Sequence, residues 1–558
     1  MDHVGSAEVR LRSRGARPKP FDWLNGLLLG LALVVSTACG REDVGTSNLR
    51  LLDEIALGTF TKTQYPIQYE EAIRIAESWK SLGLEVRLDP VNFPNPVVER
   101  LFQTRDFDAF VVYFTPQLER LEPDFFTHNT FHSSNAVPGG WNMAGFASPE
   151  FDRLAEQQRA AYDLAQRRAL ILQCQELLYQ QNPWTPIVNQ DELQAYNKTN
   201  FRNPVIPKAG GFKDVMAFFT IEPAGERKVI RWAVEWSDLK TINPLLVSES
   251  TQVRLLYFLY DTLVRYGPNT EPQFWAAEAI DNIDDTTFDV DIRKDLRFHD
   301  GAALTAEDVA FTFEFMKRNK AVYFRTVLDP IGSVEVLDRY RVRFHLEHPF
   351  APFIGQTLGM TPLLPKHVWE KVEDPTEYRN VPPIGSGPFR FEHWKAGQEI
   401  ELSRFAEHFQ PPRVEGMLLV FYGMREAAFT ALVRNETDVV DLLLPHQLEE
   451  LDQHEEIQTV RLPGHALDAL IFNVRKPPFS DTAFRLALAH AIPRQQILEE
   501  LYAGYGNPGA SMIAPANEAW SHPDLGPYPY DLSKAREILE RAGYRWDESG
   551  RLAYGPEQ

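Results

Sequence analysis

The dense alternation of strand-like and helical segments is the feature that most constrains how this chain folds. Residues 84–88 alternate apolar and charged side chains as a half-exposed strand does, whereas 66–81 carries its apolar residues at helical spacing. Further segments continue the pattern, namely a helical stretch at 149–179, a strand at 229–234, a helix at 252–260, a hairpin of 287–292 with 297–299, and a helix at 305–318. Thr305 and Asp308 form the pattern of a capping box at the start of the last helix. Strands and helices interleaved at this density predict a mixed α/β fold.

Length and charge narrow the class of protein. The 558 residues suffice for two to four structural units, at roughly 100–200 residues each. Acidic side chains number 78 against 57 basic ones, which gives a formal net charge of −21. Because no stripe of Lys and Arg is available to displace phosphate counterions, we expect no nucleic-acid partner.

The N-terminal segment predicts export. Residues 1–38 carry a basic region, a short apolar run at 26–35 and small residues before Cys39, which is the order of a secretory signal peptide. The apolar run is shorter than the roughly 20 residues that span a bilayer. Cys39 with the residues before it resembles the lipobox of bacterial lipoproteins, although Ser36 stands where Leu is usual. This resemblance implies lipidation at Cys39, a tether at 39–48, and a protein anchored by lipid on the periplasmic or cell-surface side.

The second cysteine, Cys174, lies in the predicted helical stretch. With Cys39 acylated, Cys174 has no disulfide partner, so the fold has to rely on packing alone. We interpret Cys174 as a small buried apolar residue without chemical reactivity.

Sequence motifs of catalysis and metal binding are missing. The segment 385–387 is one residue short of a G-x-S-x-G nucleophile elbow, and 299–301 (His-Asp-Gly) has the composition of a turn. Cysteine and histidine pairs with metal-ligand spacing are absent from the sequence, as are glycine-rich phosphate loops. We therefore predict that the chain is no enzyme and holds neither a cofactor nor a metal.

A series of motifs in the second half of the chain points to a family. Each motif is weak alone, and their order and number carry the argument. They are Trp275-Ala276-Ala277-Glu278, the runs 289–301 and 304–309, Ile384-Gly385-Ser386-Gly387-Pro388-Phe389, Phe472-Asn473 with Pro477-Pro478-Phe479, and the runs 484–492 and 530–544. Together they resemble the extracellular solute-binding proteins of family 5, which are the dipeptide, oligopeptide and nickel receptors of ABC importers.

The resemblance implies a fold and a function. The expected fold is the two-lobed periplasmic-binding-protein fold of type II, cluster C, with mixed sheets and an inserted subdomain. The expected function is capture of a peptide or related small solute by closure of the lobes, followed by delivery to an ABC permease complex in the inner membrane. The resemblance further implies a monomer. An envelope sensory or chaperone-like binding protein that is no longer coupled to transport is the alternative.

The order of the motifs departs from the family. Segments that look like the family's C-terminal third come first, at 76–88, 107–110, 140–152 and 182–186. The sequence therefore resembles a circular permutant, opened near 544–558 and rejoined around 223–228, where the composition is that of an exposed loop. Two degenerate half-receptors fused together are the rival interpretation.

The permutation predicts lobes that are discontinuous in sequence. The expected division is a second lobe at 49–190 and 477–558, a first lobe at 191–265 and 385–476, and an inserted subdomain at 266–384. Both ends of the receptor part then fall in the second lobe, which the lipid tether would hold at the membrane.

Residues that would contact a ligand follow from the resemblance alone. Trp236, Asn473 and the stretch 113–124, with Tyr113 and Thr115, match segments that line the cleft in the family. Peptide-binding relatives place an Asp in this stretch to pair with the peptide ammonium, and no Asp stands at that spacing here. Glu119 and Glu122 are the candidates to replace it by charge, with a solvated loop as the alternative. His128 and His132 lie nearby, but two lone histidines do not predict a metal site.

Overall fold

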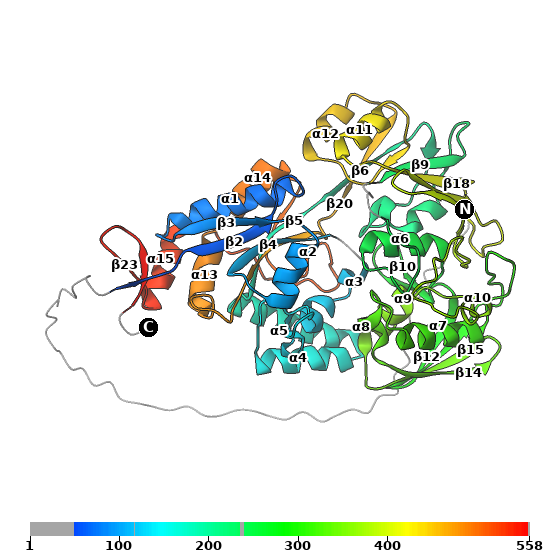
Figure 1. Ribbon diagram of the computed structural model, residues 1–558, viewed down its shortest axis with the longest axis horizontal. Coiled ribbons are helices and arrows are strands. Elements are labelled where there is room, and N and C mark those ends of the chain that lie inside the picture. The colour runs from blue at the N-terminus through cyan, green and yellow to red at the C-terminus, as the bar shows by residue number, and fades with distance from the viewer. Residues whose placement is uncertain (1–48, 116–117, 235–238, 556–558) are drawn as a thin grey trace.

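The computed structural model describes residues 49–115, 118–234 and 239–555. The chain forms two lobes, each built around a mixed sheet, with a smaller sheet beside the first lobe (Figure 1). Strands from distant parts of the chain share each large sheet, so neither lobe is continuous in sequence. The mixed α/β fold expected from the sequence is confirmed.

The second lobe contains a six-stranded sheet. Its strands in spatial order are β22 (Gly506–Pro508), β5 (Trp184–Gln190), β21 (Leu467–Phe472), β4 (Ala109–Phe114), β2 (Ile55–Phe60) and β3 (Val86–Val91). Strand β2 pairs in parallel with β3 and β4, and β21 is antiparallel to β4 and β5. Two apolar clusters pack on the sheet. One involves α1 (Pro66–Lys80), α13 (Thr482–His490), α14 (Arg494–Tyr502) and α15 (Leu532–Arg541), and the other α4 (Pro149–Ala160) and α5 (Leu164–Gln181).

The helices of this lobe follow local sequence signals. Pro66 occupies the first turn of α1, where its missing N–H costs nothing. The expected helical stretch at 149–179 is two helices, because the chain turns at 161–163 and the Asp163 carboxylate caps α5 by accepting from Gln166 N–H at 2.8 Å. Cys174 is buried in α5, as expected for an apolar core residue.

The first lobe contains a seven-stranded sheet. Its strands in spatial order are β16 (Phe389–Lys395), β17 (Glu399–Arg404), β18 (Gly416–Phe421), β9 (Val229–Val234), β19 (Val439–Val440), β6 (Glu192–Asn197) and β20 (Ile457–Leu462). Helices α6 (Ser250–Leu259), α11 (Arg425–Val433) and α12 (Pro445–Leu451) pack around it. Strand β9 lies at the centre of the sheet, paired with β18 and β19, and its residues 232–234 are buried, whereas Arg231 is exposed.

The smaller sheet lies within the expected insertion. Its strands in spatial order are β12 (Ala277–Asp284), β13 (Thr287–Ile292), β15 (Arg341–Leu346) and β14 (Ile331–Asp338), with α7 (Ala306–Arg318) packed against it. The capping box of α7 is confirmed, since the Asp308 carboxylate accepts from Thr305 N–H at 2.9 Å. The hairpin predicted between 287–292 and 297–299 is wrong, because β13 pairs with β12 and β15, and Arg297 forms only an isolated bridge with Ala303.

Several short helices and strands connect these elements. They are α2 (Asn95–Val98), α3 (Leu118–Leu121), α8 (Arg325–Leu328), α9 (Thr357–Met360), α10 (Lys366–Trp369), β7 (Phe201–Arg202), β8 (Glu222–Pro223), β10 (Val264–Tyr266) and β11 (Pro272–Phe274). Among the described residues, no helix has the length and apolarity needed to cross a membrane.

The chain crosses between the two large sheets at two places. The first crossing is Asp191, between β5 and β6, and the second is 463–466, between β20 and β21. The predicted boundary after residue 476 therefore lies beyond the second crossing. Strand β21 already belongs to the second lobe, because it pairs with β4 and β5 along its length.

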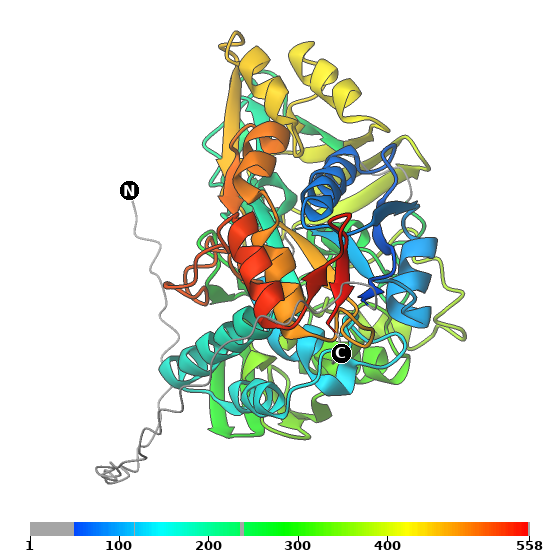
Figure 2. The same cartoon turned by 90° about the vertical axis from the view of Figure 1, so that its left-hand side faces the viewer.

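The two ends of the described chain meet in the second lobe. Strand β1 (Arg50–Leu51) pairs with β24 (Leu552–Tyr554), which also pairs with β23 (Arg545–Trp546). Figure 2 shows the red C-terminal elements lying among the blue N-terminal ones. Gly83, at φ +87°, sits under this small sheet, where a Cβ atom would come within 2.2 Å of the Gly550 carbonyl oxygen. The turn after α1 therefore requires glycine.

Candidate functional site

The edge of the second-lobe sheet beside the two crossings is the natural place for a ligand. Strands β2, β3 and β4 run in parallel, and β4 ends at Phe114, opposite Leu467 at the start of β21. Strand β5 ends at the same edge, at Gln190. Ligands of open α/β sheets bind outside the carboxyl ends of such strands. Tyr113 and Thr115, both predicted from the sequence, lie at this edge.

Tyr113 lies near groups of both lobes. It stands directly opposite Asp468 in the strand register. Burial raises the pKa of the Tyr113 hydroxyl, and the negative charges of Glu192 in the first lobe and of Asp468 raise it further. Thr115 lies in the loop that follows, where its hydroxyl oxygen accepts from the Arg120 guanidinium at 3.3 Å.

The described acidic residues of the stretch 113–124 are paired with arginines. Glu122 is 6% exposed and forms a buried ion pair with Arg167 of α5. Asp124 is fully buried and pairs with Arg159 of α4 at 3.2 Å. The side chain of Glu119 and the whole of Trp236 lie outside the described residues. The described acids of this stretch are thus tied to arginines of the same lobe.

Asn473 lies at the opposite edge of the sheet. Strand β21 runs antiparallel to β4, so its last residue, Phe472, stands opposite the first residue of β4. The Asn473 amide group donates to the carbonyl oxygens of Arg105 at 3.1 Å and Phe107 at 2.9 Å. The structure therefore does not bring Asn473 together with Tyr113 and Thr115.

His128 and His132 stack on each other with ring centroids 4.4 Å apart. Burial, with Arg159 nearby, lowers the pKa of His128 to about 4. Within the described part of the chain, no group of three or more His, Cys, Asp and Glu side chains is arranged to hold a metal ion.

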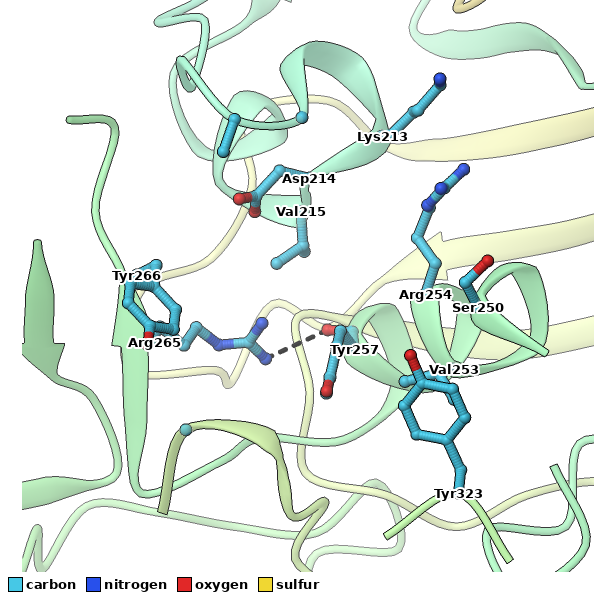
Figure 3. A pocket seen from close by; sticks show the side chains of 13 residues that line it. Lys213, Asp214, Val215, Ser250, Val253, Arg254, Tyr257, Arg265, Tyr266 and Tyr323 are labelled. Carbon is cyan, nitrogen blue, oxygen red and sulfur yellow. Dashed lines mark hydrogen bonds between the residues drawn. The ribbon is translucent and has the colours of Figure 1, made fainter. Parts of the chain in front are cut away.

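A pocket beside this stretch contains residues that sequence reasoning missed (Figure 3). Its volume is about 60 Å³, which suits a small polar group. The lining comes from the loop 209–215, helix α6, strand β10, Tyr323 and Gly359. Leu121 of the second lobe packs with Ala209 and Tyr266 of its wall, so the pocket borders the stretch 113–124. The available signal was a stripe of Ser250, Arg254 and Tyr257 at helical spacing on α6.

Three cations and one acid line this pocket. Lys213 is paired with Glu192. Arg265 is 6% exposed, and its guanidinium donates to the carbonyl oxygens of Tyr257 and Tyr260, each at 3.0 Å. Burial lowers the pKa of Arg265 and raises that of the Asp214 carboxyl. Arg254 forms a long ion pair with Asp441, in which Nη1 lies 3.9 Å from Oδ2.

The second lobe also touches the insertion directly. The hydroxyl of Tyr162, between α4 and α5, donates to the Asp285 carbonyl oxygen at 2.7 Å and accepts from Phe350 N–H at 2.9 Å. Arg159 of α4 lies over the Phe350 ring, 4.7 Å from its centroid. These contacts join the second lobe to the insertion at a place other than the two crossings.

The motifs that suggested turn chemistry have structural partners. His299 Nε2 lies 3.0 Å from the Gly387 carbonyl oxygen, and the Ser386 hydroxyl accepts from Asp261 N–H at 3.2 Å. A Cβ atom on Gly385 would come within 1.9 Å of the Leu259 carbonyl oxygen. The segment 385–387 therefore packs closely against the end of α6.

Comparisons with known proteins agree with this architecture. The family model described as "Bacterial extracellular solute-binding proteins, family 5 Middle" matches residues 271–556. The oligopeptide-binding protein AppA of Bacillus subtilis is 26% identical over 313 residues, covering 54% of this chain and 57% of that protein. The dipeptide-binding protein of Escherichia coli is 26% identical over 283 residues, covering 47% and 52%. The glutathione-binding protein GsiB of Salmonella choleraesuis is 25% identical over 313 residues, covering 55% and 60%.

Solved structures show the same fold. CtaP of Listeria monocytogenes superposes with a TM-score of 0.51 at 24% identity, covering 57% of this chain and 66% of that one. NikZ of Campylobacter jejuni, in complex with Ni(L-His), superposes with a TM-score of 0.50 at 23% identity, covering 59% and 66%. The alignments span only about half the length of the curated relatives. The family match, which extends over half of the sequence, shows that this chain belongs to the family 5 bacterial extracellular solute-binding proteins.

Proposed function

We propose that this protein is an extracytoplasmic solute receptor of an ABC importer, which binds its ligand between the lobes and delivers it to a membrane permease. The observation that carries the proposal is the pair of crossings at Asp191 and 463–466, beside which the stretch 113–124 meets the pocket of the first lobe. Two lobes joined in this way close on a ligand by hinge motion. Binding of this kind requires no turnover, so we expect no catalytic activity.

The expected ligands are peptides or related small solutes. The named relatives bind oligopeptides, dipeptides and glutathione. Tyr113 offers a flat, mostly apolar contact at the edge of the cleft, and the pocket with Arg254 and Tyr257 offers polar groups. A mostly apolar cleft with a few polar groups suits a short peptide whose ends are polar.

We further propose that the chain is a circular permutant anchored by lipid at Cys39 and active as a monomer. The six-stranded sheet, which takes strands from 55–190 and from 467–508, supports the permutation. The pairing of β1 with β24 supports it too, because permutation needs chain ends that lie close together. A tether that leads into β1 would hold the second lobe at the membrane.

Native mass spectrometry of freshly purified protein tests the receptor function. The expected spectrum contains a non-covalent complex whose excess mass disappears on denaturation and is identified by fragmentation. Protein that is refolded from urea without ligand serves as the control and should regain the complex when tripeptides are added. Protein that carries no ligand and shows no melting shift with peptides or related solutes would refute the proposal.

A further inference from the structure

The two crossings between the lobes pack directly against each other. The side-chain amide of Asn189, near the end of β5, donates to the Ala466 carbonyl oxygen of the second crossing at 3.2 Å. Gly464 lies so near that a Cβ atom on it would come within 2.5 Å of the Asn189 carbonyl oxygen. Hinge motion is absorbed by a few residues in loops and at the ends of elements. The axis of lobe movement therefore passes close to Asn189 and Gly464.

A third segment, from the second lobe, reaches the first crossing without a covalent link. Helix α14 is followed by two residues of left-handed conformation, Ala503 at φ 50° and Gly504 at φ 78°. After this turn, the Tyr505 side chain packs against an apolar cluster of the first lobe that includes parts of β6, β20, α11 and α12. The N–H of Asp191, in the first crossing, donates to the Tyr505 carbonyl oxygen at 3.3 Å. Tyr505 thus connects the second lobe to both the crossing and the first lobe.

Arg461 of β20 contacts the same groups from the side of the first lobe. Its guanidinium forms an ion pair with the Asp191 carboxylate, and the Asp191 side chain is 4% exposed. The guanidinium also lies 5.1 Å from the centroid of the Tyr505 ring, within the range of a cation–π interaction. Strand β20 belongs to the first-lobe sheet, whereas Tyr505 leads into β22 of the second-lobe sheet. Rotation of one lobe against the other therefore alters the contact between Arg461 and Tyr505.

We propose that Asp191, Arg461 and Tyr505 form a clamp that holds the two lobes in the described arrangement from the side of the hinge. A contact that differs between two arrangements shifts the equilibrium between them by its difference in free energy. The clamp acts together with the contacts of Tyr162, which join the second lobe to the insertion elsewhere. Breaking the clamp therefore increases the fraction of molecules in which the second lobe stands away from the insertion. The inference rests on the lobe movement that the proposed function requires, and it specifies which residues set the equilibrium of that movement.

Distance measurements by pulsed electron resonance on ligand-free protein test the clamp. Spin labels are attached through Arg153→Cys in α4 and Arg318→Cys in α7, two exposed positions, in a chain with Cys39→Ser. Cys174 is buried and stays unlabelled. The protein is stripped of ligand in urea and refolded before the measurement. The distance distribution then gives the ratio of separated molecules to molecules in the described arrangement. Because no ligand is involved, a negative result would leave the receptor function standing.

Variants of the clamp should change this ratio in a defined order. Arg461→Met keeps an apolar stem but removes the ion pair and the cation–π contact, and we expect the ratio to rise roughly two- to fivefold. Tyr505→Leu should give a smaller rise because the ion pair remains, and Tyr505→Phe, which keeps the ring, should give none. Arg461→Met with Tyr505→Leu should shift the ratio no further than Arg461→Met alone, because the two residues share one contact. Arg404→Met, at an exposed position of β17 in the same sheet, removes the same charge and should change nothing.

Three results would overturn the clamp: an unchanged ratio in Arg461→Met, an equal rise in Arg404→Met, or single effects that multiply in the double variant. Gly464→Ala checks the position of the hinge independently, because its Cβ atom would push the crossings apart. It should alter the distance distribution, whereas Gly526→Ala, which has open space around its Cβ position, should not. An unchanged distribution in Gly464→Ala would place the hinge elsewhere and overturn the clamp. Circular dichroism verifies that each variant is folded.

Discussion

Replacing Glu71 by Gln is expected to stabilise the protein increasingly as the pH rises. Glu71 of α1 and Asp468 of β21 are fully buried and share one neighbour, the hydroxyl of Tyr502 at the end of α14. The hydroxyl oxygen lies 3.0 Å from Glu71 Oε1 and 2.9 Å from Asp468 Oδ2. One hydroxyl proton serves only one of the two acids, so the other contact requires a proton on a carboxyl group.

Glu71 is the acid that keeps this proton. Burial, with the Asp468 charge nearby, raises the pKa of Glu71 well above its usual value. Burial also raises the pKa of Asp468, to about 7, although Gln68 and Gln190 each donate to its carboxylate at 2.9 Å. The second carboxyl oxygen of Glu71, Oε2, has no hydrogen-bond partner among the described residues.

The magnitude follows from linkage between protonation and folding. In the unfolded chain a glutamate loses its proton near pH 4.3, whereas folded Glu71 keeps it, so the folded state binds more protons. Stability from this group therefore falls as the pH rises, by about 1.4 kcal/mol per pH unit. Glu71→Gln removes the titration and retains an amide that can donate to Tyr502. From pH 5 to pH 7 its free energy of unfolding should gain about 3 kcal/mol relative to the wild type.

Urea unfolding followed by circular dichroism at pH 5, 6 and 7 measures this difference. Glu77→Gln, an exposed site on the same helix, is the matched control and should show a difference that stays constant with pH. If the free energy of unfolding of Glu71→Gln relative to the wild type stays constant with pH, or falls as the pH rises, Glu71 does not keep its proton in the folded state.

Three further perturbations test other parts of the structure. Tyr162→Phe removes the hydrogen bonds that join the lobe to the insertion, about 1 kcal/mol, so small-angle scattering should detect a more open ligand-free protein. Arg167→Met leaves the buried Glu122 charge without its partner and should lower the free energy of unfolding by roughly 3–5 kcal/mol in urea titrations. Burial raises the pKa of Cys174 to about 12, so a thiol reagent at pH 8 should label it only after denaturation. Rapid labelling of the native protein would contradict its burial.

Local signals in the sequence predicted much of the architecture. The strand pattern of β9 and the capping box of α7 each depend on a few consecutive residues, and both were found where expected. The family, too, followed from motifs that match position by position, and the comparisons confirm it. Such features depend on neighbours within a few residues, which is why the sequence alone suffices for them.

Pairing between distant segments decided the rest. Whether 297–299 forms a strand depends on which segment pairs with β13, and β13 pairs with β15 instead. Asn473 was separated from Tyr113 because β21 runs antiparallel to β4 along its whole length, which places Asn473 beyond the start of β4 and Tyr113 near its end.

By itself, the sequence determined the fold class, the family and the main helices and strands of this protein, because each rests on local pattern. Only the tertiary structure decided where the lobes divide, that Glu122 is tied to Arg167, and that Arg254 and Arg265 meet in one pocket. The physical reason is that burial and charge pairing are set by contacts between residues far apart in the chain. Those contacts exist only once the sheets are assembled.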